Sequence, residues 1–403
     1  MALRKKILYI HTAGVFGGSS RSLFEMLKAA DLDGCEIFFL TQRGSVEEYF
    51  KKFGRVISVR GLSQFDHGRY SFYRGVRWLI LLREIFYLPF LFFGLIRVRL
   101  LSKNLDIIHI NDFVGLPAIL FALILFESKI VVHVRSLVNS DAQLLRTRAL
   151  NWILKNKVDS VVCIDETVRR TIDAKVDALI VHNGLGISEA DQHQEVNYSA
   201  EQEPLRVGFV GNLLLQKGIL DLVEAAAILK KDGISCQFLI YGHVTGGKKG
   251  AIASILEIAG IRQDVRLKVL ALVNFYSLED SFIFKGFSDD LEAAYKSFDL
   301  LCFPSHLDAP GRPVLEAAYF SRPSIVAVKN PTSDTIVNNV TGLTIQPHAL
   351  NQLVDAIKVF HADRSLLKVM GRAAKNLSDR EYDQEKNSVR IFKLYDSVIS
   401  PEN

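Results

Sequence analysis

Two glycine-containing turns in the second half of the sequence hold the residues best suited to binding chemistry. The first follows an apolar run at 206–210 and contains Gly211, Lys217 and Gly218. A short turn that opens a helix presents unpaired backbone N–H groups at the positive end of the helix dipole, and such a site suits a phosphate. The lysine would add a full positive charge. Alternatively, the glycines only shape a tight turn and the lysine is solvated.

The second turn lies at residues 303–318 and reads FPSHLDAPGRPVLEAA. Pro313 is suited to begin a helix whose first turn holds Glu316. Gly311 allows a ligand to approach the backbone closely, and the amides at 312–315 would face the same point. The carboxylate of Glu316 can accept two hydrogen bonds from the hydroxyls of a ribose, as acidic residues do in dinucleotide sites. The alternative is an acid that only caps the helix.

The elements that must position these turns follow the pattern of a parallel α/β fold. Short apolar runs of strand length alternate with longer helical patterns along the whole sequence. In the first half we expect strands at 6–11, 36–41, 56–59, 107–111, 130–134, 160–164 and 178–182. In the second half we expect them at 206–210, 237–241, 281–285, 300–303 and 324–327.

A length of 403 residues exceeds one ordinary core, so two domains are expected. Both halves open with a strand, a glycine turn and a helix, which predicts two Rossmann-like domains with parallel sheets facing across a cleft. We interpret the polar stretch 191–204 as a linker between an N-terminal domain at 1–190 and a C-terminal domain at 205–384. A final helix at about 385–403 is expected to pack back on the N-terminal domain.

Composition excludes several classes of protein. The net charge of +5 is a small excess and gives no indication of nucleic-acid binding. The four cysteines form no CxxC pair and are interpreted as reduced core residues, and no metal-ligand spacing is present. The apolar runs at 85–96 and 113–126 are shorter than the ~20 residues that a membrane-spanning helix needs. The first residues resemble a strand rather than a signal peptide, which predicts a cytoplasmic protein.

The spacing between Asp308 and Glu316 resembles the E-x7-E motif of the retaining family 4 glycosyltransferases, with aspartate in the first position. The residues around it are also similar to the block of that family. Further similarities follow in the family's order along nearly the whole chain, at 17–21, 106–109, 181–184, 211, 217–218, 241–242, 284–286, 295, 299–300 and 322–323. Each similarity is weak alone, but their shared order over both halves is specific.

This resemblance implies the GT-B fold and the retaining transfer of a sugar from a nucleotide-diphosphate sugar of the UDP or GDP type. The donor would bind to the C-terminal domain, and a saccharide or lipid-linked acceptor mainly to the N-terminal domain, in the synthesis of a surface glycan. No cofactor and no metal are implied. The alternatives are a nucleotide-sugar epimerase or a sugar phosphorylase on the same fold, and a non-catalytic nucleotide-sugar-binding protein.

The resemblance also implies roles for individual residues. Lys217 would bind the diphosphate and Glu316 the ribose. The donor-binding residues would be Gly211, Asn212, Lys217, Gly242, Gly311, Arg312, Pro313, Val314 and Glu316. The residues that bind the acceptor or close over the diphosphate would be Gly17, Gly18, Ser19, Arg21, His109, Asn111 and Asn183. The catalytic residues would be Asp308, His133, Arg135 and Lys217.

Three positions depart from the family pattern. Asn212 stands where the family commonly has an arginine, so another arginine of the chain would have to supply that positive charge. Asp308 is one methylene shorter than the usual glutamate. The position of the family's cleft histidine falls on Arg135, and His133 lies two residues earlier on the same side of the strand. His133 is also compatible with a buried strand histidine.

No pair of carboxylates in the sequence stands out as the nucleophile and acid/base couple of a glycosidase. Catalysis is therefore expected to depend on positioning and electrostatics. Cations and backbone amides would stabilise the departing nucleotide diphosphate while the acceptor hydroxyl attacks from the same face.

Residues 69–103 combine basic and aromatic side chains. They contain seven Lys or Arg residues against one acid, Glu84, with Phe, Tyr and Trp residues between them. Such a helical stretch is typical of an interfacial element that touches anionic lipid, and it predicts a protein peripheral to a membrane. The alternative is a pair of helices that pack their apolar sides on the sheet and keep their arginines in solvent.

Overall fold

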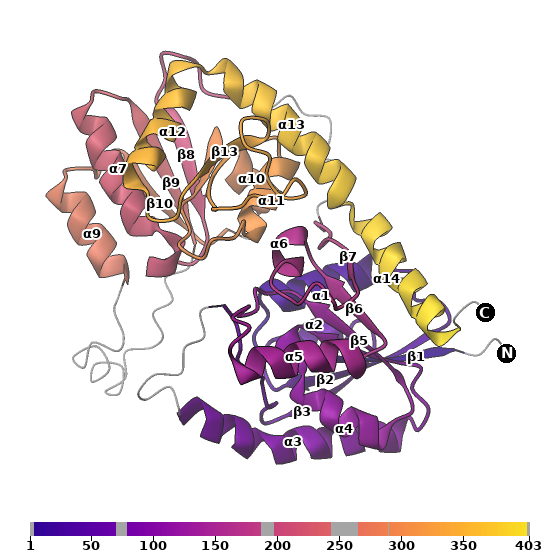
Figure 1. Cartoon of the computed structure of the whole chain (residues 1–403). Coiled ribbons are helices and arrows are strands. Elements are labelled where there is room, and N and C mark those ends of the chain that lie inside the picture. Colours follow the sequence, from indigo (N-terminus) through magenta and orange to yellow (C-terminus); the bar gives the residue numbers. More distant parts are fainter. Residues whose placement is uncertain (1–3, 70–78, 187–196, 243–264, 289, 401–403) are drawn as a thin grey trace. The chain divides into compact units, whose positions relative to one another are not determined.

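The computed structural model describes residues 4–69, 79–186, 197–242, 265–288 and 290–400, and it divides the chain into two compact units (Figure 1). Unit 1 comprises Met1–Ile187 together with Tyr382–Asn403, and unit 2 comprises Ser188–Glu381. Each unit contains a parallel sheet with helices on its faces, so the prediction of two Rossmann-like α/β domains is confirmed.

The described residues of unit 1 form a seven-stranded parallel sheet with the order β3-β2-β1-β4-β5-β6-β7. Its strands are β1 (Lys5–His11), β2 (Cys35–Gln42), β3 (Arg55–Val59), β4 (Ile107–Asn111), β5 (Lys129–Val134), β6 (Ser160–Cys163) and β7 (Ala178–Ile180). The order reverses between β1 and β4. In open α/β sheets, ligands bind at the carboxyl ends of the strands beside such a reversal.

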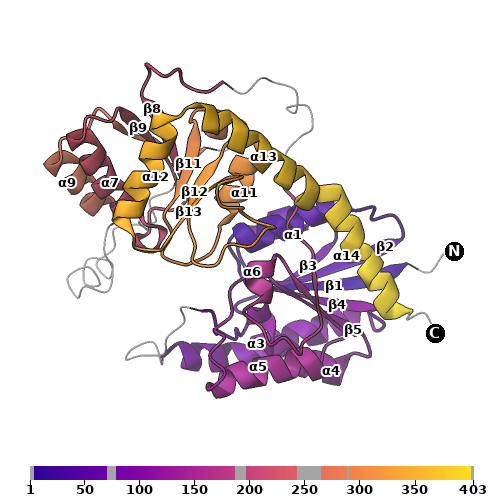
Figure 2. The ribbon, with the colours of Figure 1, turned by 45° about the horizontal axis from the view of Figure 1, so that its top comes forward.

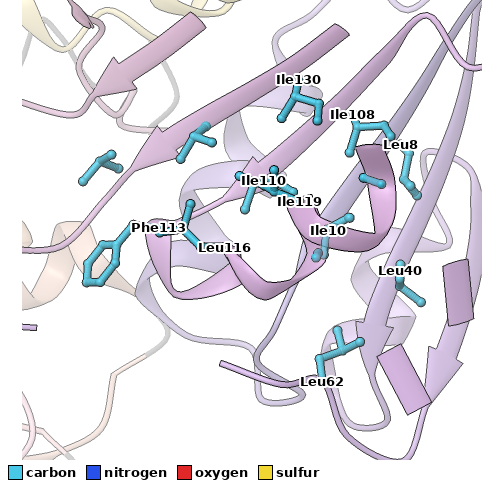
Figure 3. Packing of buried hydrophobic residues seen from close by; sticks show 14 of the residues in the cluster. Leu8, Ile10, Leu40, Leu62, Ile108, Ile110, Phe113, Leu116, Ile119 and Ile130 are labelled. Atoms are coloured by element: carbon cyan, nitrogen blue, oxygen red, sulfur yellow. The ribbon is translucent and has the colours of Figure 1, made fainter. Parts of the chain in front are cut away.

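The helices of unit 1 cover both faces of this sheet. They are α1 (Gly18–Lys28), α2 (Val46–Phe50), α3 (Leu79–Leu101), the short 3₁₀ helix η2 (Phe113–Gly115), α4 (Pro117–Leu125), α5 (Leu145–Asn156), α6 (Glu166–Arg169) and α14 (Gln384–Ile399). Side chains alternate along a strand, so β1 sends Leu8 and Ile10 to one face and Ile7 and Tyr9 to the other. Figure 3 shows the first of these faces, where Leu116 and Ile119 pack over the strands.

Helix α14 belongs to unit 1 although unit 2 precedes it in the chain. Its Ser388 hydroxyl donates to the carbonyl oxygen of Met26 on α1, at 2.8 Å. Its Tyr395 is fully buried, with its hydroxyl 2.8 Å from Nδ1 of His109 on β4. The helix therefore covers the face of the sheet that α1 also covers.

The described residues of unit 2 form a six-stranded parallel sheet with the order β10-β9-β8-β11-β12-β13. Its strands are β8 (Leu205–Val210), β9 (Cys236–Tyr241), β10 (Phe282–Gly286), β11 (Leu300–Phe303), β12 (Ser324–Ala327) and β13 (Gly342–Ile345). Strand β13 was not predicted. It has four residues, only one of them buried hydrophobic, and it pairs with β12 alone at the edge of the sheet.

The helices of unit 2 also lie on both faces of its sheet. They are η4 (Leu215–Lys217), α7 (Ile219–Lys231), α9 (Val265–Phe275), α10 (Leu291–Lys296), α11 (Arg312–Tyr319), α12 (Leu350–Ala362) and α13 (Ser365–Glu381). Figure 2 shows α7, α9 and α12 together on one side of the strands and α11 with α13 on the other.

The predicted linker at 191–204 differs from the structure where it can be compared. Residues 191–196 lie outside the described residues. The following residues are packed on unit 2, because the backbone N–H and the hydroxyl of Ser199 both donate to the buried carboxylate of Asp299, at 2.8 and 2.6 Å. The Tyr198 hydroxyl donates to the carbonyl oxygen of Ser321. This stretch is therefore part of the fold of unit 2.

Candidate functional site

The two predicted turns of unit 2 meet through a close backbone contact. Gly218 is the N-cap of α7 and has a φ of 72°, in the left-handed region. A Cβ atom at this position would lie 1.9 Å from the carbonyl oxygen of Pro304, which follows β11. Only glycine allows both the dihedral angle and the contact. The turn after β8 is thus held against the segment after β11.

A second close contact joins the ends of β8 and β9. A Cβ atom on Gly242 would lie 1.9 Å from the carbonyl oxygen of Gly211. The Gly211 N–H donates to the carbonyl oxygen of Tyr241 at 2.9 Å, and the Gly242 N–H donates to that of Gly286 at 2.8 Å. Three neighbouring strands therefore end at glycines, at Gly211, Gly242 and Gly286, and the backbones of these strand ends approach one another closely. Asn212, the next residue, is exposed.

The ring of Phe303 connects the lysine of the first turn to the helix of the second. The Nζ atom of Lys217 lies 5.0 Å from the centroid of this ring. A Cβ atom on Gly311, the N-cap of α11, would lie 2.5 Å from the ring's Cζ atom. Burial lowers the pKa of Lys217. Among the described residues, no carboxylate forms an ion pair with this lysine.

Glu316 is buried, and its carboxylate is held by two side chains. Its Oε2 accepts a hydrogen bond of 2.6 Å from the Tyr295 hydroxyl, and its Oε1 accepts one of 2.7 Å from Nε of Arg312. Helix α11 begins at Arg312, so Glu316 lies in the second turn, and the prediction that it lies in the first turn is wrong. The capping residue of this helix is Gly311, since its extended backbone suits that position.

Not all of the residues predicted to offer a free backbone N–H group at the start of α11 do so. Pro313 has no N–H group, and the Val314 N–H donates to the carbonyl oxygen of Gly311 at 2.9 Å. The Asp308 carboxylate is also engaged, since its Oδ1 accepts a 2.7 Å hydrogen bond from the backbone N–H of Lys329. Asp308 itself is buried and has a φ of 49°, which aspartate tolerates better than most residues. The carboxylate therefore fixes the turn to the segment that follows β12.

In unit 1, Arg135 connects the ends of several strands. This residue directly follows β5 and is only 9% exposed. Its guanidinium donates to Asn111 Oδ1 at the end of β4, at 2.6 Å, and to Asn183 Oδ1 after β7. It also lies 3.1 Å from Nδ1 of His133. The predicted residues Asn111, His133, Arg135 and Asn183 are thus brought together.

One hydrogen bond fixes the backbone of Arg135, and another extends the cluster to the turn before α1. The Asp112 carboxylate accepts a 3.0 Å hydrogen bond from the Arg135 N–H, and burial raises the pKa of this carboxyl. The Asn111 side-chain amide donates to the carbonyl oxygen of Ser19 at 3.2 Å and lies 2.9 Å from Nδ1 of His11. The glycine turn before α1 is therefore attached to the cluster through Ser19.

His11 was missed by the sequence analysis, although it is the last residue of β1 and directly precedes the first glycine turn. Burial, with a further contribution from the charge of Arg135, lowers its pKa to about 3. The same two causes hold the pKa values of His109 and His133 well below the usual range, and for His133 the neighbouring His109 lowers the pKa further. The three imidazoles are therefore neutral near pH 7. A position at the carboxyl end of a central strand was the available signal for His11.

Two other predicted residues of unit 1, His109 and Arg21, have their main contacts outside the cluster, although the ring of His109 lies 5.4 Å from that of His133. His109 is fully buried against Tyr395 of α14 and contributes to the packing of that helix. Helix α1 begins at Gly18 with Gly17 as its N-cap, and the side chain of Arg21 pairs with Glu25 one turn further along, at 3.0 Å.

A small hollow lies beside the Arg135 cluster within unit 1. It is lined by His133, Arg135 and Asn183 at the strand ends, and by residues of α1 and α14. The Nε2 atom of His133 is buried and has no hydrogen-bond partner among the described residues. The hollow thus combines a cation, an amide and a neutral imidazole, which suits a polar or anionic ligand.

The outer face of α3 is apolar. The side chains of Ile85, Phe86 and Phe93 are each more than half exposed, whereas Leu91 and Leu95 on the other side are buried in the core. On α4, the exposed apolar residues are Leu120, Leu123 and Ile124.

The predicted basic and aromatic stretch at 69–103 contains one acid, Glu84, which is buried and pairs with Arg83. Predicted residues 70–78 of the stretch lie outside the described residues. Within the described chain, no helix has the length and apolarity required to span a bilayer.

Comparisons with known families divide the chain in the same two parts. Residues 16–188 match the family described as Glycosyltransferase Family 4, and residues 191–377 match the family described as Glycosyl transferases group 1.

Two curated proteins illustrate the relationship in sequence. The poly(ribitol-phosphate) alpha-N-acetylglucosaminyltransferase of Staphylococcus aureus is 24% identical over 273 residues, which are 66% of this chain and 50% of the relative. The alpha-D-kanosaminyltransferase of Streptomyces kanamyceticus is 24% identical over 237 residues, which are 56% of each protein. The chain therefore matches about half the length of these curated relatives.

Solved structures show the same fold over nearly the whole chain. HepE of Anabaena, crystallised with UDP and glucose, superimposes with a TM-score of 0.71 at 16% identity and covers 98% of this chain and 100% of its own. Sucrose-phosphate synthase of Thermosynechococcus elongatus gives a TM-score of 0.72 at 19% identity, covering 99% of this chain and 100% of its own.

Proposed function

Because the chain belongs to the glycosyltransferase group 1 family with the GT-B fold, we propose that it is a retaining glycosyltransferase. In this proposal it moves a sugar from a nucleotide-diphosphate sugar to a saccharide or lipid-linked acceptor in the synthesis of a surface glycan. The relatives from S. aureus, which include a capsular polysaccharide glycosyltransferase, support the last part.

The observation that carries the proposal is the convergence of Lys217, Gly218 and Gly311 around Phe303 and Pro304. Here a half-buried ammonium group lies near the beginning of a helix and beside strand ends made of bare backbone, and it pairs with no carboxylate in the part of the chain that the structure describes. Backbone N–H groups and a helix N-terminus favour a negative charge. A diphosphate would supply that charge, and the lysine would keep its own charge more easily in its presence.

The buried carboxylate of Glu316 supports a ribose next to this diphosphate. Its orientation is fixed by Tyr295 and Arg312, so it does not have to be ordered when a ligand binds. Each carboxylate oxygen has a second lone pair, which a ribose hydroxyl can use. We propose a donor of the UDP or GDP type. UDP is the first to test, since HepE binds it.

The Arg135 cluster of unit 1 supports binding of the acceptor. Its guanidinium donates to the uncharged side chains of Asn111 and Asn183, and an anionic group of an acceptor, such as a phosphate, would gain an interaction with this buried cation. Saccharide hydroxyls would find amide and imidazole partners in the same hollow.

We propose that transfer proceeds by electrostatic stabilisation rather than through a carboxylate pair. Lys217 and the beginning of α11 would stabilise the departing diphosphate while the acceptor hydroxyl attacks the same face of the donor sugar. Asp308 and Glu316 each already accept hydrogen bonds from protein donors, which suits positioning roles. We propose no cofactor and no catalytic metal for this reaction.

The test uses the purified full-length protein with a panel of UDP-sugars and GDP-sugars. Acceptor-stimulated release of nucleoside diphosphate, with the product linkage analysed by NMR, is expected to show retention. Isomerised donor would identify an epimerase instead. Binding without turnover would identify a nucleotide-sugar-binding protein, which the exposed Asn212 in place of an arginine would explain.

Variants of Lys217 and Glu316 test whether the donor nucleotide binds at this site. Lys217→Ala is expected to weaken UDP or GDP binding by roughly 10–100-fold, since a charged hydrogen-bonding partner is lost. Glu316→Gln keeps the shape of the side chain and is expected to weaken binding of the nucleotide sugar. Lys230→Ala, at the far end of α7, is the control and should bind like the parent. Unchanged nucleotide affinity in both site variants would show that the donor binds elsewhere.

We also propose that the exposed apolar faces of α3 and α4 bind an anionic membrane surface. The exposed Arg97, Arg99 and Lys103 border the apolar residues, and such a combination favours anionic lipid headgroups. A Phe86→Ser and Phe93→Ser double variant is expected to lose binding to vesicles that contain anionic lipid. Phe275→Ser, which changes an equally exposed phenylalanine on α9, is the control. Absence of binding of the parent protein to such vesicles would disprove the proposed membrane surface.

A further inference from the structure

Three side chains of unit 2 that are far apart in the sequence converge beside the first turn of α7. Asp221 lies in that turn, His306 follows β11, and His348 lies between β13 and α12. Their ligating atoms all lie within 4.8 Å of one another. The sequence spacing predicted no metal site, because these residues have no motif spacing and only the strand order brings them together.

The contacts within this trio resemble those of ligands before a metal ion is bound. His306 Nε2 lies 2.8 Å from Asp221 Oδ2, and both side chains are partly exposed. The imidazole of His348 stacks on that of His306 with the ring centroids 3.7 Å apart and an angle of 32° between the planes. Two imidazoles and one carboxylate offer the nitrogen and oxygen donors that zinc prefers.

The geometry needs only small movements. Zinc bonds of about 2.0–2.2 Å in a tetrahedral arrangement place ligand atoms about 3.4 Å apart. The His306 and Asp221 atoms would therefore separate slightly, and a proton on Nε2 of His306 would pass through solvent to Nδ1, which leaves the Nε2 lone pair for the ion. His348 would move toward them. It lies on an exposed loop with a φ of 64°.

We propose that Asp221, His306 and His348 form a zinc site with an open fourth position for water. Two imidazole ligands favour zinc or a similar first-row ion over magnesium or calcium. The site does not depend on glycosyl transfer, because no nucleotide is needed to form it. The His306 N–H donates to the carbonyl oxygen of Gln216 at 2.9 Å, so a bound ion would also hold the segment that contains Lys217.

Calorimetric titration of the EDTA-treated full-length protein with ZnCl₂ tests this site in the absence of nucleotide. The parent is expected to bind one ion with a micromolar or lower dissociation constant. His348→Ala and Asp221→Asn are each expected to weaken that binding at least ~10-fold. His361→Ala, which removes a histidine of α12 outside the trio, is the matched control and should bind like the parent.

A second readout shows the ligand geometry. With CoCl₂ in place of ZnCl₂, the parent should develop the visible absorption of tetrahedral Co²⁺, and both site variants should lack it. MgCl₂ should give no heat of binding. Absence of zinc binding by the parent, or equal binding by the parent and both variants with unchanged circular dichroism, would overturn the proposal. The trio would then be a hydrogen-bonded Asp–His pair with a stacked imidazole.

Discussion

Units 1 and 2 share a parallel sheet with helices on both faces, yet the groups at their strand ends differ in kind. Unit 2 brings its segments together by backbone contacts that only glycine permits, at Gly218 against Pro304 and at Gly242 against Gly211. Unit 1 uses buried side chains, with Arg135 bonded to Asn111 and Asn183. The same fold therefore supports one site that is mostly main chain and one that is mostly side chain.

Because of this difference, the two sites should be sensitive to different kinds of substitution. A site made of main chain is disrupted when a side-chain atom is added, because the new atom would overlap with the neighbouring backbone. A side-chain site fails when an atom is removed, because buried polar partners lose their hydrogen bonds. Substitutions at matched positions in the two units can therefore test the comparison directly.

The largest effect is expected from Arg135→Ala in unit 1. The substitution removes the buried cation and leaves Oδ1 of Asn111 and of Asn183 without this donor. We expect sugar transfer to fall by roughly 10²–10³-fold, the usual cost of one electrostatic catalytic group. Release of nucleoside diphosphate measures this effect, and Arg148→Ala on α5 is the control. A rate close to that of the parent would exclude Arg135 from the site.

In unit 2 the corresponding test adds an atom. Gly218 and Gly233 have nearly the same φ, 72° and 75°, but a Cβ on Gly233 meets no atom within 4 Å. Gly233→Ala should cost about 1 kcal/mol for the left-handed backbone alone. We expect Gly218→Ala to cost about 2 kcal/mol more because of the contact with Pro304. Thermal unfolding of the two variants measures the difference, and equal losses would contradict the contact.

Acidification should lower the free energy of unfolding of unit 1, because its buried histidines are neutral when the unit is folded. His11 has a pKa of about 3 when folded, against about 6.5 for an unfolded chain. Between these values the unfolded state binds more protons, so stability falls as the pH falls from about 6.5 toward 3. The free energy of unfolding should be about 2 kcal/mol lower at pH 5 than at pH 7.5 from His11 alone.

Urea unfolding at the two pH values checks this expectation, and the lowered pKa values of His109 and His133 add to it in the same direction. His11→Gln should reduce the difference in the free energy of unfolding between the two pH values. Equal stability of the parent at pH 7.5 and pH 5 would mean that these imidazoles are not buried in their neutral form.

The smallest effect is expected from adding a side-chain cation to the main-chain site. Asn212 is exposed beside Gly211. Asn212→Arg should raise the affinity for UDP or GDP by up to ~10-fold through one charged hydrogen bond, with a steeper dependence on salt. Asn212→Gln is the control for side-chain length. If the arginine variant binds like the glutamine variant, the diphosphate does not reach the end of β8.

The sequence was sufficient to predict the sheets and the edges at which ligands bind. Buried strands such as 107–111 and 130–134 are largely apolar runs, and parallel strands end at one edge of a sheet, which is where Asn111 and Arg135 meet in the structure. The short edge strand β13 has no such run and was missed.

Hydrogen-bond partners were beyond the reach of sequence spacing. The engagement of Asp308 by the Lys329 N–H depends on how the turn folds back toward β12. Likewise, the Tyr295 hydroxyl reaches Glu316 only because α10 lies beside α11 in the folded unit. The approach of Asp221, His306 and His348 needs the strand order as well, since they come from separate segments.

The position of α14 has a consequence for synthesis of the protein on the ribosome. Unit 2 is one continuous stretch of chain, Ser188–Glu381, so it can fold as soon as that stretch has emerged. Unit 1 has to wait until residues 384–399 follow, because Ile391 and Tyr395 complete the packing on Ile7 and Tyr9. The half that is translated first is therefore finished last, and until then the part of its sheet that α14 covers is open to chaperones or to aggregation.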